Sequence, residues 1–383
     1  MNKNKKRVIA SFIIKTLGND QYQAILIPVS AVLLSLIVGS VIILMLGKNP
    51  ITAYLDILQG SGILPKTQYA GNKNMLTTFF DLIDYWTPLI FASLSVAVAL
   101  KAGMFNIGVP GVMLTSGFVS TIIVGYSSAS VVVGKGMTIV IGITVGICIG
   151  SFVGFLKYKF NINEVVMTVM LNYIAEYIIS FFIISKYIDP ISRQSIAINE
   201  ASSLTLHNVS IGGIKYNIPL GIVVAIIVVV LLRFILEKTT FGYELKAVGL
   251  NKKAAAYAGI NVSRNIVAAF ALAGALAGLA GVTYYLGYVT SIQTKSLPDL
   301  GFTAIAVAVL GNSNPWGCFL TSLLISVLGK GSTYMTSSSG LDSEIAALIT
   351  ALVLLFSACG AIVKRRVARL KAELKEVESG TDH

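Results

Sequence analysis

The chain has 383 residues, of which 55% are hydrophobic and 12% are charged, and its mean hydropathy is +0.81. A water-soluble domain of this length needs far more charge to cover its surface, so the composition excludes an ordinary soluble protein. The net charge of +12 does not indicate nucleic acid as a partner, because no basic patch is interleaved with aromatic residues that could stack on bases. We therefore expect membrane lipid to surround most of the chain.

Ten apolar segments follow one another along the chain. About 20 apolar residues cross a hydrocarbon core about 30 Å thick, so the segments predict about ten transmembrane helices. Backbone that faces lipid must pair its polar groups internally, and no alternating barrel pattern is present, so we expect an all-α polytopic membrane protein. Gly, Pro and Asn interrupt the second, third and eighth segments, which are either full spans or re-entrant. The ten predicted segments are 24–46, 84–101, 108–126, 137–156, 164–185, 217–236, 265–287, 300–313, 317–335 and 343–363.

The distribution of positive charge predicts the orientation. Most of the 29 Lys and Arg residues fall on the side that holds both termini, and the positive-inside rule places that side in the cytoplasm. The transmembrane domain, 24–363, then lies between a basic cytoplasmic N-terminus, 1–23, and a cytoplasmic tail, 364–383.

Three longer loops connect the predicted helices. We expect outer loops at about 47–83, with a short helix at 51–58, and at about 186–216. The second outer loop contains the alternating stretch LTLHNVSIGGIKYNI, whose central Gly-Gly suggests a small β-hairpin. The main cytoplasmic loop is 237–264.

Motifs for catalysis are absent from the sequence. It has no Gly-x-x-x-x-Gly-Lys-Ser/Thr phosphate-binding loop, no Ser-His-Asp set, no His-Glu-x-x-His helix and no Cys-x-x-Cys pair. The 2 His and 3 Cys residues have no metal-ligand spacing. We therefore predict no enzymatic activity, no catalytic or metal site, and no cofactor bound by this chain. Uphill transport would need energy from an ion gradient or from a separate protein.

The segment KAGMFNIGVPGVMLTSG, at 101–117, interrupts apolar sequence with four glycines and Pro110. Broken helices are tolerated in a membrane protein where they are buried or line a cavity, and transporters use the freed backbone groups to contact substrate. Asn106 offers donors and an acceptor there. Two interpretations stay open: Asn106 borders a substrate cavity, or small residues let helices pack closely and Asn106 ties them together.

A polar stripe follows the fifth segment, where Glu164, Thr168, Asn172, Glu176 and Ser180 are spaced by four. Each step of four advances about 40° around a helix, so Thr168, Asn172 and Glu176 share a sector about 80° wide. Polar groups in a span usually face a cavity or a partner. These three residues are therefore candidates for the substrate pathway, and hydrogen bonding between helices is the alternative. Glu164 lies near the boundary and is either solvated or a helix cap, and Glu176 is either protonated or paired.

The cytoplasmic loop is predicted to be helical over 242–259, with a break between two short helices after Gly249. A helix with one polar and one apolar face can dock in a groove of another protein, although a solvated connector is the alternative. The polar face carries Glu244, Lys246, Asn251, Lys252 and Lys253, and the apolar face carries Leu245, Val248, Leu250 and Tyr257.

Two features lie in the seventh segment. The small-residue run AAFALAGALAGLAG, at 268–281, lets helices approach closely. Tyr284, Tyr285 and Tyr288 near its outer end form either an interfacial aromatic belt or a surface on which a nucleobase stacks during entry.

Four stretches of the chain, in order, resemble one family. They are FNIGVPGVML (105–114), NEVVMTVMLNYIA (163–175), TTFGYELKAVGLNKKAAAYAGI (239–260) and AVAVLGNSNPWG (306–317). They are similar to motifs of the permease subunits of bacterial ATP-binding-cassette (ABC) importers for nucleosides and simple sugars. The second stretch is most typical of the nucleoside branch. Val109-Pro110 replaces the usual acidic residue, commonly Glu at position 110, so the local backbone and a charge at the cavity edge are expected to differ.

The resemblance implies a permease subunit of a nucleoside importer in the bacterial cytoplasmic membrane. It also implies a second permease subunit, a cytoplasmic ATPase that uses ATP and Mg²⁺, and an extracytoplasmic substrate-binding protein or lipoprotein. The alternatives are a permease for ribose or another simple sugar and, in a different class, an autonomous secondary carrier or channel. By resemblance, the cytoplasmic loop is the coupling helix that contacts the ATPase, with candidate residues Glu244, Leu245, Gly249, Leu250 and Asn251.

Overall fold

The structure is a computed structural model that describes residues 20–66, 68–69, 73–127, 130–211, 213–342, 344–345, 347–353 and 355–356. The predicted basic N-terminus up to residue 19 and the cytoplasmic tail, 364–383, lie outside the described residues. The described residues form two compact units, one of 20–54 with 335–356 and the other of 55–334.

The first unit begins with helix α2, Asp20–Met45, which is followed by α3, Pro50–Gly60. The chain bends by 116° between the two helices. Within this unit the Tyr54 hydroxyl donates a hydrogen bond to the Leu36 carbonyl, 2.6 Å away, and so ties the start of α3 back to α2. The short helix predicted at 51–58 is confirmed.

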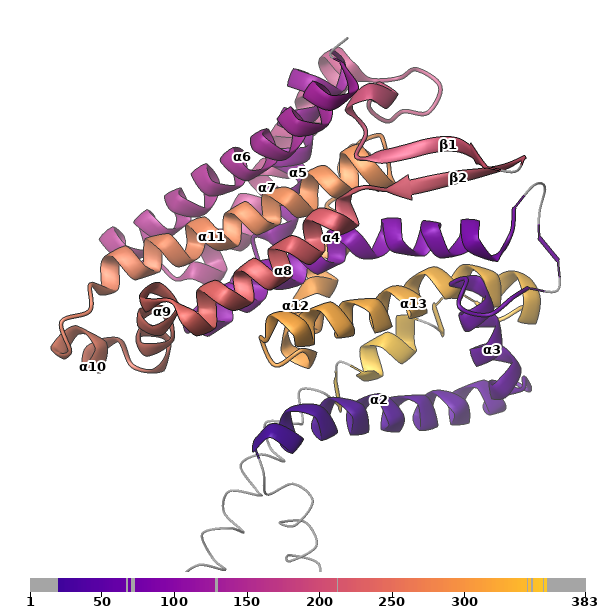
Figure 1. Cartoon of the computed structure of the whole chain (residues 1–383), viewed down its shortest axis with the longest axis horizontal. Helices are drawn as coiled ribbons and strands as arrows, with labels where there is room; N and C mark the ends of the chain where they lie inside the picture. Colours follow the sequence, from indigo (N-terminus) through magenta and orange to yellow (C-terminus); the bar gives the residue numbers. More distant parts are fainter. Residues whose placement is uncertain are drawn as a thin grey trace, which may run out of the picture. The chain divides into compact units, whose positions relative to one another are not determined.

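The second unit holds most of the helices and a small sheet (Figure 1). The last helix, α13, begins in this unit and runs on into the first. The elements are α4 (Met75–Lys101), α5 (Val109–Ser120), η1 (Thr121–Gly125), α6 (Val131–Phe160), α7 (Glu164–Phe182), η2 (Ile183–Tyr187), η3 (Glu200–Ser202), β1 (Thr205–Ile211), β2 (Ile214–Pro219), α8 (Gly221–Lys238), α9 (Thr240–Leu250), α10 (Lys252–Tyr257), α11 (Val262–Thr283), η4 (Tyr284–Tyr288), α12 (Asp299–Leu310) and α13 (Pro315–Ser339).

The predicted number of membrane spans is confirmed only in part. Helical residues lie in each of the ten predicted segments, as far as these are described. Within the part of the chain that the structure describes, four helices can cross a membrane by length and composition, and five can if the bent pair α2–α3 counts as one span. The four are Met75–Lys101, Val131–Phe160, Glu164–Tyr187 and Val262–Tyr288. The helices Val109–Gly125 and Asp299–Leu310 are apolar but shorter, and at a rise of about 1.5 Å per residue each is shorter than a hydrocarbon core about 30 Å thick.

Helix α4 begins at Met75, inside the range 47–83 that the sequence predicts as an outer loop. The start is set by a capping box: the Asn74 side chain accepts from the Thr77 backbone N–H, and the Thr77 hydroxyl oxygen accepts from the Asn74 N–H, each at 2.9 Å. Hydropathy does not detect this first part of α4 because Asp81 lies in it and Asp84 directly follows it. Asp84 is buried, and its carboxylate accepts a hydrogen bond of 2.7 Å from the Thr205 hydroxyl.

The hairpin predicted in the second outer loop is confirmed. Strands β1 and β2 pair antiparallel, with Thr205 opposite Pro219 and Ile211 opposite Ile214. Gly213 lies in the turn with φ +82°, a left-handed conformation that glycine adopts without strain. The otherwise all-α fold therefore carries one two-stranded sheet among its described residues.

The tightest helix contact joins α6 to α11. Glycines on both helices face each other, and a Cβ added to Gly146 would collide with the carbonyl oxygen of Gly274. The same is true of Gly278 against the carbonyl of Gly142. Small residues let the two backbones touch directly, which is how helices associate when lipid removes the hydrophobic driving force. The predicted packing role of the run 268–281 is thus confirmed.

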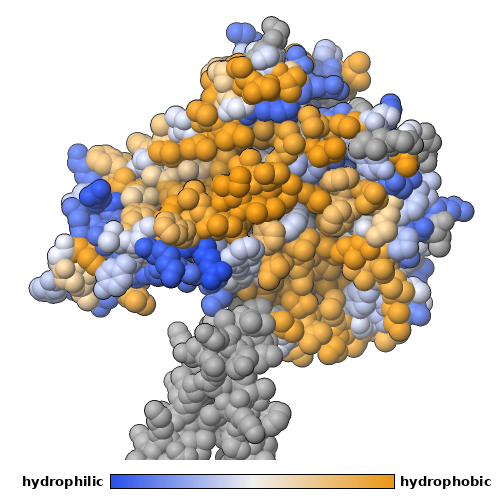
Figure 2. Space-filling view, viewed as in Figure 1, coloured by the Kyte–Doolittle hydropathy of each residue, from blue (hydrophilic) through white to orange (hydrophobic). Residues whose placement is uncertain are grey.

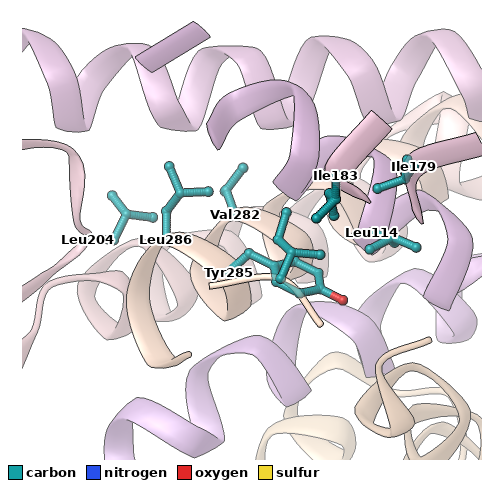
Figure 3. Close-up of a cluster of buried hydrophobic side chains, with 8 residues drawn as sticks. Leu114, Ile179, Ile183, Leu204, Val282, Tyr285 and Leu286 are labelled. Atoms are coloured by element: carbon teal, nitrogen blue, oxygen red, sulfur yellow. The ribbon is translucent and has the colours of Figure 1, made fainter. Parts of the chain in front are cut away.

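A hydrophobic cluster lies at the C-terminal end of α11, where this helix continues into η4. It combines side chains of α5, α7, η2, α11 and η4 with residues of two loops (Figure 3). Its buried members are Leu114, Ile179, Ile183, Leu204, Val282, Tyr285, Leu286 and Ile292. The helices α5, α7 and α11 each continue into a π-helical segment, namely η1, η2 and η4. The wider turn of a π-helix re-aims the side chains that follow it.

The outer surface of the helices is apolar. Helix α8 exposes a row of large hydrophobic side chains that includes Val223, Ile227, Val230 and Phe234. Figure 2 shows the broad hydrophobic surface, with hydrophilic residues gathered around α9 and α10. An apolar band with polar residues beyond its edge is the pattern of a protein that lies in lipid.

We predict that Gly146→Leu disrupts the α6–α11 contact, because the new side chain has no space against the Gly274 backbone. Overpacking of this kind costs about 1–3 kcal/mol or more, and we expect loss of detergent-stable folded protein in fluorescence-detected size-exclusion chromatography. Gly136→Leu is the matched control on the same helix, since a Cβ at Gly136 meets nothing within 4 Å. Equal recovery of both variants would contradict the packing role.

Candidate translocation site and coupling surface

The predicted interruption after the second segment is present as a break between α4 and α5. Helix α4 ends at Lys101, Gly103 takes φ +68°, and α5 begins only at Val109. The Asn106 side chain accepts from the Gly108 N–H at 2.9 Å and so stabilises the non-helical turn. Pro110 lies in the first turn of α5, where its missing N–H costs nothing and its fixed φ favours a helix start.

Asn172 of α7 holds the start of α5 in place. Its side-chain oxygen accepts from the Gly111 N–H, and its amide nitrogen donates to the Ile107 carbonyl, both at 2.9 Å. The first N–H groups of a helix have no partner within the helix, and Gly108, which precedes α5, supplies no side-chain cap. Asn172 therefore acts as a cap from a neighbouring helix, and both ends of its amide group are used.

The rest of the polar stripe on α7 makes several different contacts. Thr168 is buried against Gly108, where an added Cβ would lie 3.1 Å from the Thr168 Cβ. Glu164 pairs with Lys157 at 2.7 Å, so its charge is neutralised at the start of α7. Ser180 accepts from the Lys295 N–H at 2.8 Å, and Glu176 lies half-buried one turn beyond Asn172.

A cavity of about 420 Å³ lies between α5, α6, α7 and α11. Asn106, Thr115 and Thr168 supply polar groups to a lining that is otherwise mostly apolar. Cys148 also lines it, and its side chain is accessible. The volume is within the range of sites for small ligands. Of the predicted pathway residues, the structure brings Asn106 and Thr168 together in this wall; Asn172 lies behind it, and Glu176 is outside the lining.

The predicted break in the cytoplasmic loop is confirmed, at Asn251. Helix α9 ends at Leu250 and α10 begins at Lys252. The Asn251 side chain accepts from the backbone N–H groups of Lys253 and Ala254, at 3.0 and 3.1 Å, and thereby caps α10.

The apolar face expected on this loop divides into two parts. Leu245 and Val248 are buried within the subunit, whereas Leu250 and Tyr257 are 89% and 95% exposed. Tyr243, which the sequence analysis missed, is also exposed. The reason is that one side of α9 packs against α8, α11 and α4. The exposed apolar side chains of the loop are therefore Tyr243 and Leu250 of α9 and Tyr257 of α10.

Glu244 and Gly249, two candidates for coupling, contact the subunit itself. The Glu244 carboxylate accepts from the Asn265 side chain at 2.8 Å and so fixes α9 to α11. Gly249 lies directly against the turn after α4: a Cβ on Gly103 would be 2.6 Å from the Gly249 carbonyl oxygen, and a Cβ on Gly249 would collide with the Lys101 carbonyl. This contact between two backbones joins the cytoplasmic loop to the break that precedes α5. Gly103 and Gly249 are far apart in sequence, and the sequence pattern does not predict that they are in contact.

Comparison with known proteins gives a consistent result. The family described as branched-chain amino acid transport system / permease component matches residues 78–358. The chain is 33% identical to the nucleoside ABC transporter permease protein NupB of Lactococcus lactis subsp. cremoris (strain MG1363), over 92% of this chain and 96% of the relative. It is 32% identical to the guanosine ABC transporter permease protein NupP of Bacillus subtilis (strain 168), over 91% and 97%.

A sugar permease is more distant. The glucose ABC transporter permease protein TsgB13 of Haloferax volcanii is 29% identical over 88% of both chains. No solved structure matches the chain.

We predict that Asn172→Leu destabilises the subunit by about 1–2 kcal/mol, a typical size for a hydrogen bond within the membrane, because the Gly111 N–H and the Ile107 carbonyl lose their partner. The melting temperature of the purified subunit measures this change. Thiol labelling of Cys148, in a background without the other cysteines, should become faster as the cavity wall loosens. Tyr173→Leu is the control, since the next residue on α7 is exposed. An unchanged melting temperature with slowed uptake would instead mean that Asn172 contacts the substrate.

Proposed function

The chain belongs to the family of branched-chain amino acid transport system permease components, and from this premise we propose that it is the permease subunit of an ABC importer for nucleosides. The observation that carries the substrate class is the similarity to NupB and NupP across more than nine-tenths of each chain. The motif NEVVMTVMLNYIA on α7 supports the same branch.

The chain is a transport subunit and a multi-pass membrane protein. We infer that both termini face the cytoplasm of a bacterial cell, as the charge distribution predicts. Because the sequence lacks a phosphate-binding loop, ATP and Mg²⁺ would be bound by a separate ATPase subunit. A second permease of the same family would complete the membrane part, and an extracytoplasmic binding protein or lipoprotein would deliver the substrate.

Two surfaces of α9 support a coupling role. The exposed side chains Tyr243 and Leu250 of α9, with Tyr257 of the adjoining α10, are apolar groups that a groove of the ATPase could receive. On the opposite side, Gly249 contacts the turn after α4. A displacement of α9 would therefore press directly on the break between α4 and α5, without an intervening flexible side chain.

The polar contacts of α7 extend this route into the membrane part. Asn172 holds both Ile107 and Gly111, so movement of the break would carry α7 with it. The cavity wall formed by Asn106 and Thr168 would then change shape. We propose that Asn106, Thr168, Asn172 and Glu176 border the translocation pathway in at least one state of the cycle, as alternating access requires.

A simple sugar is the second candidate substrate, supported by the similarity to TsgB13. An autonomous secondary carrier would need neither an ATPase nor a coupling surface. Uptake measurements separate the three. Purified importer in proteoliposomes should take up radiolabelled guanosine only with internal ATP and the binding protein. Uptake of glucose alone would indicate the sugar branch, and guanosine uptake by this subunit under an ion gradient would indicate a carrier.

We predict that Gly249→Val abolishes substrate-stimulated ATP hydrolysis while the subunit stays in the membrane and keeps its ATPase bound. The new side chain collides with the Lys101 carbonyl and changes the contact that transmits movement. Gly136→Val is the control for replacing a glycine that has open space around it. Normal stimulated hydrolysis in Gly249→Val would remove this contact from the coupling route.

Leu250→Ser tests the other side of α9. It removes an exposed apolar side chain from the proposed docking surface, so the ATPase should bind about tenfold more weakly, the effect of losing a modest anchor residue. The melting temperature of the isolated permease should not change, because Leu250 is 89% exposed.

A further inference from the structure

Three half-buried tyrosines form a continuous group where α11 passes into η4. The Tyr85 ring of α4 lies 5.4 Å from the Tyr288 ring at an angle of 71°, and the Tyr284 and Tyr288 rings are 6.0 Å apart. Tyr285, between them in sequence, is turned into the hydrophobic cluster beside Leu286 and Val282 (Figure 3). Its ring lies 4.9 Å from the Tyr284 ring, edge to face, so Tyr285 joins the half-buried tyrosines to the hydrophobic core.

A lysine lies against this group. The Lys330 ammonium of α13 is 5.0 Å from the centre of the Tyr288 ring and 3.4 Å from its hydroxyl. Tyr85 reaches the same helix, since a Cβ on Gly329 would lie 3.0 Å from its hydroxyl oxygen. We call Tyr85, Tyr284, Tyr288 and Lys330 the tyrosine–lysine site.

Among the described residues, Lys330 has no carboxylate within 4.0 Å of its ammonium. The two ion pairs within 4.0 Å among the described residues lie elsewhere, one between α6 and α7 and one on α8. Lys330 interacts at longer range with the Asp84 carboxylate, which is already engaged by Thr205. A charged group in an apolar helix is costly, and such groups usually face a cavity, a ligand or a partner. The ammonium has three donors, and the Tyr288 hydroxyl uses one.

The remaining charged groups around the site lie toward its loop side. Lys66, whose ammonium lies 4.4 Å from the centre of the Tyr334 ring, and Asp81 are on the loop and helix start before Tyr85. Burial lowers the pKa of Lys66, and the neighbouring charges of Lys73 and Lys330 act in the same direction. Asp299 at the start of α12 interacts electrostatically with Tyr85 and Tyr284. Four helices thus bring aromatic rings and charges of both signs to one place.

We propose that the tyrosine–lysine site contacts the base of a nucleoside on its way through the permease. This rests on the proposed function, and it adds where the base is contacted and by which groups. A purine or pyrimidine has a flat π-face that stacks on tyrosine rings, whereas a sugar has none. The Lys330 ammonium can donate to acceptors on the base edge, such as the O6 and N7 atoms of guanine.

The geometry differs from that of an interfacial aromatic belt. Belt tyrosines project singly into lipid with their hydroxyls at the headgroups. Tyr173 and Tyr177 of α7, 51% and 65% exposed, project outward from their helix. The rings of the tyrosine–lysine site instead contact one another and α13. Tyr284 and Tyr288 lie four residues apart in the π-helical η4, and π-helical segments are frequent at functional sites.

The test uses the complete importer in proteoliposomes and radiolabelled guanosine below saturation. Tyr288→Leu should slow uptake about tenfold or more, the range that loss of base–aromatic stacking produces. Tyr288→Phe keeps the ring and should stay within about twofold of the parent protein on the same reasoning. Tyr177→Leu, an exposed tyrosine on another helix, is the control. Basal ATP hydrolysis should be equal in all of them.

The role of Lys330 is tested by the substrate preference of the importer, which the loss of a merely structural contact would not change. Adenine carries an amino group where guanine carries O6, so Lys330→Met should lower the preference for guanosine over adenosine by about tenfold, the discrimination that such an edge contact supplies. Lys330→Arg should retain most of that preference. An unchanged ratio in Lys330→Met would remove the lysine from base recognition.

Photolabelling decides the matter if Tyr288→Leu fails to assemble. In the parent importer, 8-azidoguanosine should label peptides that contain Tyr85 or the segment 284–288, and guanosine should compete. Label confined to other peptides would overturn the proposal. Guanosine uptake at the parental rate by both Tyr288→Leu and Lys330→Met would overturn it as well, while the proposed function would stand. A parent importer that carries glucose but no nucleoside would overturn both.

Discussion

The close approach of α6 and α11 is the constraint on which the rest of the second unit depends. In lipid, the hydrophobic effect does not drive two apolar helices together. Their association therefore relies on direct van der Waals contact between their backbones. The facing glycines Gly146 and Gly274 permit this contact. Once α11 is fixed there, its continuation η4 lies beside α5 and α7, and Tyr285 completes the hydrophobic cluster. The cavity between α5, α6, α7 and α11 also follows from this arrangement.

A second direct contact between backbones lies where the proposed ATPase would act on the subunit, at the cytoplasmic loop. Gly249 and Gly103 leave no side chain between the cytoplasmic loop and the turn that leads to α5. A long side chain at such a point would absorb small displacements by changing rotamer. Two glycines transmit them, because peptide units are stiff and close-packed interiors carry strain. The Glu244 carboxylate also fixes α9, because it accepts a hydrogen bond from Asn265 of α11.

Several polar groups within the helices connect one element to another through hydrogen bonds. Asn172 uses its whole amide group to hold the start of α5, and Asp84 receives the Thr205 hydroxyl from the hairpin. Such groups stabilise the fold only if every donor and acceptor finds a partner. Lys330 departs from this pattern, because its neighbours are aromatic rings and a distant, already engaged carboxylate. Because its charge has no closer counterpart among the described residues, we propose that Lys330 contacts a ligand.

The sequence by itself determined the class of the protein, the positions of most helices, the break at 102–108, the division of the cytoplasmic loop at Asn251 and the hairpin with its Gly213 turn. These features depend on local chemistry: apolar length, caps, and the backbone freedom of glycine. Hydropathy missed the start of α4, up to residue 83, because Asp81 lies in it and Asp84 directly follows it, and it could not tell full spans from shorter helices. Only the tertiary structure decided that Leu245 is buried while Leu250 is exposed, that Asn172 caps a neighbouring helix, and that Tyr285 is buried while Tyr284 and Tyr288 are half-buried. Each of these depends on which residues far apart in the chain come into contact, and a periodic pattern in one helix carries no information about the partner that it meets.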